Sequence, residues 1–67
     1  MMADTKTVLR LLKTARGQMD GIIKMVEDDR YCIDISQQLM ATEAILNRAN
    51  KEILAAHLKH CVQEAAT

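Results

Sequence analysis

The second half of this sequence contains no residue that would interrupt a helix. From about residue 30 to about residue 65 there is no glycine, and the whole chain contains no proline. Residues with high helix propensity, such as Ala, Leu, Met, Lys, Glu and Gln, dominate the segment. Its apolar residues recur at helical spacing: Ile33, Ile35, Leu39, Met40, Ile45, Leu46, Ala49, Ile53, Leu54, Leu58 and Val62. The pattern predicts one continuous helix roughly 50 Å long.

A shorter amphipathic helix is predicted before it, over about residues 5–27. Its apolar residues form one stripe at steps of three, four and seven: Val8, Leu11, Leu12, Ala15, Met19, Ile22, Ile23 and Val26. Asp4 or Thr5 can cap its start. The acidic residues 27–29 predict a short turn, because carboxylates are unfavourable at a helix C-terminus. We therefore predict a single all-α domain over residues 1–67, with the second helix over about residues 30–65.

The two predicted helices cannot bury each other completely. A chain of this length buries only about 60% of its unfolded surface, so a single copy is marginally stable. The longer helix also extends far beyond the shorter one. We therefore expect two copies to form an antiparallel four-helix-bundle dimer, with a tetramer as the larger alternative.

Composition excludes several classes of protein. Nine Lys and Arg balance nine Asp and Glu, so the chain lacks the bulk positive charge of a general nucleic-acid binder. No apolar run is long enough to cross a membrane, and no secretion signal precedes the first helix. We find no phosphate-binding loop and no nucleophile–base pair, so we do not expect an enzyme. The two cysteines are expected to be reduced thiols in a cytoplasmic protein.

Three residues form the candidate metal site: Cys32, His57 and Cys61. His57 and Cys61 are four positions apart, on one face of the long helix. Cys32 and Cys61 are 29 positions apart, or about 44 Å along a continuous helix, so one chain cannot bring them together. In an antiparallel dimer that crosses near Leu46, Cys32 of one chain meets His57 and Cys61 of the other. A cysteine and a histidine at this spacing are, however, more often buried packing residues than ligands.

The donor set of this predicted site favours Cu(I). Two thiolates and one imidazole are too few for structural zinc, which takes four ligands. Cu(I) is satisfied by two or three soft donors, and thiolates select it. We therefore expect Cu(I), in two identical sites per dimer.

Three short segments and one further residue also occur at a spacing that is highly specific for one family. They are GQMDGI at 17–22, MVEDDRYC at 25–32, Gln38, and HLKHC at 57–61. This combination resembles the CsoR/RcnR family of metal-sensing transcriptional repressors over roughly residues 5–64. The resemblance implies an all-α dimer or tetramer that binds Cu(I) through Cys32, His57 and Cys61, with Tyr31 beside the ligands.

The resemblance also separates the copper branch from the other branches of the family. The nickel/cobalt branch has His at the position of Cys61 and another His near the N-terminus. The formaldehyde branch uses an N-terminal Pro, and the persulfide branch lacks the His. His57 therefore points to copper.

The sequence departs from the family where its members contact DNA. Leu11 and Thr14 occupy two positions at which the family usually has arginine, and the 67 residues hold no counterpart of the family's third helix. Four basic residues remain on the first helix as possible DNA contacts, against the alternative of a solvated helix face: Lys6, Arg10, Lys13 and Arg16.

These departures lead to three hypotheses about function. The first is a Cu(I) chaperone or buffer with weakened DNA binding, which passes copper to a partner such as a copper-exporting ATPase. The alternative is a repressor that releases operator DNA when Cu(I) binds. A sensor of persulfide or similar thiol chemistry is the least favoured of the three.

Overall fold

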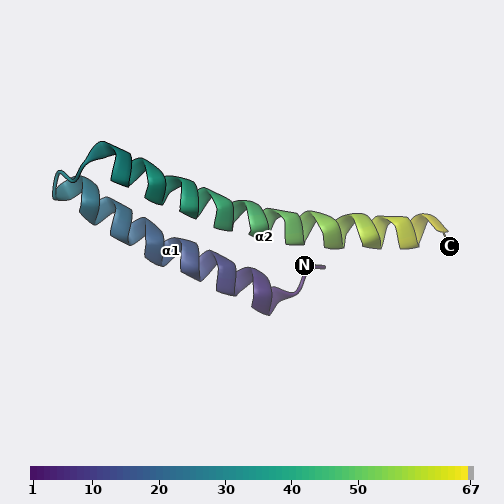
Figure 1. Cartoon of the computed structure of the whole chain (residues 1–67). Coiled ribbons are helices and arrows are strands. Elements are labelled where there is room, and N and C mark those ends of the chain that lie inside the picture. Colours follow the sequence, from purple (N-terminus) through teal and green to yellow (C-terminus); the bar gives the residue numbers. More distant parts are fainter. Residues whose placement is uncertain (67) are drawn as a thin grey trace.

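The computed structural model is a hairpin of two antiparallel helices (Figure 1). It describes the backbone of residues 1–66 and the side chains of residues 1–60. Helix α1 spans Thr5–Glu27 and helix α2 spans Cys32–Ala66. The hairpin measures 57 × 19 × 11 Å, because the C-terminal end of α2 extends well beyond α1. The predicted all-α fold is confirmed for the described residues, which contain no strand.

The turn between the helices explains why α2 begins two residues later than predicted. Three backbone N–H groups of the turn donate to carbonyls in the last turn of α1: Asp28 to Lys24 (2.9 Å), Asp29 to Val26 (3.1 Å) and Arg30 to Met25 (3.0 Å). This is the Schellman pattern of helix termination. It places Asp29 at the left-handed position, with φ of +54°. The reversal occupies the chain through Tyr31, so the first helical residue is Cys32.

Asp4 is the N-cap residue of α1. Its backbone carbonyl accepts a hydrogen bond from the N–H of Val8 at 3.0 Å. The hydroxyl of Thr7 donates to its carboxylate. This hydrogen bond lowers the pKa of the exposed Asp4 carboxyl. Of the two predicted capping residues, Asp4 occupies the N-cap position, and its side chain accepts from the Thr7 hydroxyl rather than from a backbone N–H.

The interface between α1 and α2 is mainly aliphatic. The buried residues of α1 are Val8, Leu11, Ala15 and Ile22, and those of α2 are Thr42 and Ala49. Ile35, Ile45 and Ile53 of α2 are half-buried at the same interface. Thr42 is 2% exposed and is the buried polar residue of the described part of the chain. Its hydroxyl lies 2.8 Å from Oε1 of Gln18 on α1 and 3.2 Å from the carbonyl oxygen of Gln38.

One broad side of the hairpin leaves large apolar side chains uncovered. We call this side the open face and define it by Leu12, Met19, Ile23, Leu39, Leu46 and Leu54, which are all 40% exposed or more. A groove of about 260 Å³ runs along it between the helices, lined by Leu12, Ala15, Arg16, Met19, Asp20 and Leu46. The predicted apolar stripe is thus divided, and α2 covers only part of it.

Candidate metal centre

Cys32 and His57 lie near opposite ends of the open face. Cys32 is the first residue of α2, is exposed and forms no disulfide. Starting from Cys32, steps of seven, seven, eight and three residues along α2 lead to Leu39, Leu46, Leu54 and His57, which places all five on one face of the helix. His57 is exposed. Cys32 and His57 therefore share the helix face that α1 does not cover.

One chain does not bring the ligands together. Helix α2 is continuous from Cys32, so 25 residues separate Cys32 from His57, or about 38 Å. Among the residues whose side chains are described, no group of three His, Cys, Asp or Glu residues could hold a metal ion. Cys61 lies one helical turn after His57, but its side chain is outside the described residues. The structure is thus compatible with the predicted shared site, which remains a prediction.

Tyr31 lies in the turn immediately before Cys32. Its ring is 66% exposed. Its carbonyl oxygen accepts the hydrogen bond of the Ile35 N–H at 3.2 Å, which is the first hydrogen bond of α2. The main chain of Tyr31 thus fixes the start of the helix that carries Cys32, and a role of its ring at the metal site remains a prediction.

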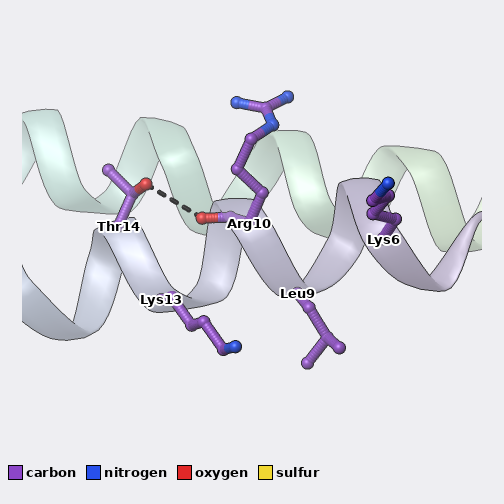
Figure 2. Close-up of a pocket in the computed structure, with 5 residues that line it drawn as sticks. All are labelled: Lys6, Leu9, Arg10, Lys13 and Thr14. Carbon is purple, nitrogen blue, oxygen red and sulfur yellow. Dashed lines mark hydrogen bonds between the residues drawn. The ribbon is translucent and has the colours of Figure 1, made fainter.

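The four predicted DNA contacts do not form one group. Figure 2 shows Lys6, Arg10 and Lys13 on the outward side of α1, with α2 behind the helix. They surround a shallow hollow that Leu9 and Thr14 also line. The hydroxyl of Thr14 donates to the carbonyl oxygen of Arg10 at 2.9 Å (Figure 2). Arg16, in contrast, lines the groove of the open face, and its contact with DNA remains a prediction.

The contact between Gln18 and Thr42 was not predicted from the sequence. A signal for it was present, because Thr42 stands seven residues after Ile35 and seven before Ala49, in the row of α2 that faces α1. A hydroxyl in the middle of such a row predicts a buried hydrogen bond.

Comparison with known proteins identifies the family. Residues 4–67 match the family described as metal-sensitive transcriptional repressors. The chain belongs to this family. The copper-sensing repressor CsoR of Mycobacterium ulcerans is 48% identical over 60 residues, which are 90% of this chain and 51% of that protein. The CsoR of Bacillus subtilis is 44% identical over 54 residues, or 81% of this chain and 54% of that protein.

A solved structure has the same fold. The copper-sensing repressor CsoR with Cu(I) from Geobacillus thermodenitrificans superposes with a TM-score of 0.84 at 40% sequence identity. The match covers 98% of this chain and 73% of that one. The predicted resemblance to the copper branch of the CsoR/RcnR family is confirmed.

The comparisons also bear on the competing hypotheses about function. The chain spans about half the length of the curated relatives it matches. A missing third helix is therefore no argument against DNA binding. The relatives are named copper-sensing transcriptional repressors, and repressors are not enzymes. Their names favour the repressor alternative over the chaperone hypothesis. Within the described residues, neither helix is long and apolar enough to cross a membrane.

Proposed function

We propose that this CsoR-family protein is a copper-responsive transcriptional repressor that releases operator DNA when Cu(I) binds. One observation carries the proposal. Cys32 and His57 lie near opposite ends of one open apolar face, in a chain that is 40% identical to a Cu(I)-containing repressor across 98% of its length. A second copy that covers the open face in antiparallel orientation brings Cys32 of one chain to His57 and Cys61 of the other.

The open face supports the second copy as its occupant. Leucines at 39, 46 and 54 continue along α2 from Cys32 almost to His57, so the apolar surface and the ligands form one strip. Burial of the apolar area that these side chains still expose would favour pairing by about 25 cal/mol per Å². An antiparallel pairing of two such strips around Leu46 buries the leucines and creates two equivalent sites.

The ligands suit a soft cation with low coordination number. Cys32 and Cys61 supply two thiolates and His57 supplies a neutral imidazole nitrogen, a set that Cu(I) accepts with three ligands. Because the donors would come from two chains, Cys32 of one protomer and His57 and Cys61 of the other would together hold Cu(I) at each end of the open face. Binding there would favour the arrangement of protomers in which those donors meet.

These outward sides carry the positive charge that a DNA backbone requires. Lys6, Arg10 and Lys13 lie on each of them and recur in every copy of the assembly. Phosphate contacts of this kind fix the position of a protein on DNA, and the affinity falls steeply with salt. In the proposed mechanism, the form without copper holds these side chains at the spacing that fits the operator.

A Cu(I) chaperone that serves a copper-exporting ATPase remains the second candidate, and two positions on α1 favour it. Leu11 is 2% exposed and cannot contact a phosphate. Thr14 brings no charge, and its hydroxyl already donates to Arg10. These are the two positions at which the resemblance implies arginine.

Fluorescence anisotropy with the DNA upstream of the gene separates the two functions. The repressor proposal predicts DNA binding that is lost when one Cu(I) per chain is added, with release abolished by Cys32→Ser. Asp34→Ser, on the first turn of the same helix, is the matched control and should release DNA normally. No DNA binding even at low salt, together with copper transfer to a chelator or acceptor domain, would support the chaperone and overturn the repressor.

A further inference from the structure

The hydrogen bond between Gln18 and Thr42 lies inside an interface that is otherwise aliphatic. Thr42 stands between Ile35 and Ala49 in the row of α2 that faces α1, and Gln18 is half-buried opposite it. Apolar contact is non-directional. Both rows repeat their apolar residues every three to four positions, so a shift of one helical turn again places apolar side chains against apolar side chains. Aliphatic packing alone therefore defines the register of α1 on α2 weakly.

Thr42 can form hydrogen bonds with both Gln18 and Gln38 only when the Gln18 amide has one particular orientation. Its hydroxyl has a single proton but lies within hydrogen-bond distance of Gln18 Oε1 and of the Gln38 carbonyl oxygen. Rotation of the Gln18 amide by half a turn presents Nε2 instead, which donates to Thr42 Oγ1 while Thr42 donates to Gln38. A shift of register breaks the hydrogen bond between Gln18 and Thr42, a polar contact between the helices, while the bond of Thr42 to Gln38 within α2 remains.

The short turn couples the register of α1 on α2 to the conformation of the first turn of α2. Only residues 28–31 join the helices, and three of their N–H groups are bound to α1. Movement of α1 along α2 by one turn must therefore wind or unwind the first turn of α2. That turn begins with Cys32.

We propose that the Gln18–Thr42 hydrogen bond locks the register of the hairpin, and that both are positioning residues for Cys32 in the shared Cu(I) site. The second half of this inference rests on the proposed function. When only a fraction of the chains place Cys32 correctly, the apparent dissociation constant for Cu(I) rises by the inverse of that fraction.

Two substitutions at one position test the lock. Thr42→Val keeps the shape of the side chain but removes the hydroxyl, whereas Thr42→Ser keeps the hydroxyl but removes a methyl group. In the intact protein, amide NMR spectra of Thr42→Val should show more than one set of resonances for residues around Gln18 and Cys32. Thr42→Ser should show a single set, like the unmodified protein. Equal behaviour of the two variants, or one set of resonances in both, would overturn the lock.

Competition with a Cu(I) chelator tests the effect on the metal site. Thr42→Val should weaken Cu(I) binding by the same factor by which the NMR spectra show the population of the locked register to fall. Gln18→Met should do the same, the double variant should bind no more weakly than either single one, and Thr42→Ser should bind normally. Unchanged affinity in Thr42→Val with split resonances would refute the positioning role alone. Failure of the unmodified chain to bind Cu(I) would refute the proposed function and the positioning role, while the NMR result still decides the lock.

Discussion

The covered and open faces of this hairpin use apolar residues in opposite ways. Where α1 meets α2, aliphatic residues such as Leu11, Ile22 and Ala49 are buried. The open face instead displays leucine, isoleucine and methionine side chains that are 40% exposed or more. The contact within the chain therefore sets the geometry of the hairpin. Much of the hydrophobic free energy of burial is gained only when a partner covers the open face.

Leu46→Glu should break the open face and have the largest effect. A carboxylate at the centre of the proposed dimer contact loses its solvation without gaining a partner, at a cost of several kcal/mol. Analytical ultracentrifugation should show monomers, and circular dichroism should show a strong loss of helix at 25 °C. Gln37→Glu, an equally acidic change on an exposed polar position of α2, is the control. A folded Leu46→Glu dimer would show that the open face is not the interface.

Ala49→Leu should damage the covered face with a smaller effect. Ala49 is 3% exposed against α1, and a larger side chain there forces the helices apart, for which about 1–3 kcal/mol is typical. Urea unfolding should show this loss, while sedimentation should still show the dimer. Ala55→Leu adds the same bulk at an exposed position and should be nearly neutral. Dissociation of Ala49→Leu without loss of helix would contradict the division between the faces.

Asp29→Gly should stabilise the turn that joins the two faces. Asp29 has a positive φ that glycine adopts without steric cost, so the gain should be about 0.5–1 kcal/mol. Thermal or urea unfolding would measure it. Asp28→Gly is the matched control, because Asp28 has a φ of −85° and gains nothing from glycine. Equal effects of the two substitutions would argue against the Schellman termination of α1.

The cap of α1 should have the smallest effect, and only in acid. The Thr7 hydroxyl lowers the pKa of Asp4, so the ionised carboxylate is favoured in the folded state. Its contribution is present above the ordinary pKa of an aspartate and is lost as the pH falls through the lowered folded pKa. Asp4→Asn should therefore reduce the pH dependence of unfolding in that acid range, measured by circular dichroism. An unchanged pH dependence would contradict the role of the carboxylate.

Helical periodicity predicted both elements, because neither helix is interrupted and their apolar residues recur regularly. The bounds of α1 agree with the prediction, whereas α2 begins at Cys32 because the hydrogen bonds of the turn consume residues 28–31. Composition could not predict which half of the wide apolar stripe faces α2. Leu11 and Leu12 are chemically identical neighbours, yet they are 2% and 42% exposed. That choice depends on the tertiary packing of the two helices.

The candidate site was predictable to a lesser degree. The spacing of Cys32 and His57 shows that one helix cannot bring them together, and the structure places both on the face that α1 leaves open. The spacing of Arg16 to Lys13 did not predict that Arg16 lines the groove of the open face, because a residue at the edge of a stripe can belong to either side of a helix. The hydrogen bond between Gln18 and Thr42 was not predicted, because the apolar pattern does not show which polar residues meet across the two helices.

Complementation between two defective chains tests the shared site most directly. Chains with Cys32→Ser and chains with Cys61→Ser are unfolded together in equal amounts, refolded and titrated with Cu(I). Each variant alone should bind no copper tightly. Random pairing should give mixed dimers, with one chain of each variant, as half of all dimers. Each mixed dimer has one complete site of two, so tight binding should return to about a quarter of the unmodified level. No recovery in a mixture shown by mass spectrometry to contain the mixed dimer would contradict the shared site.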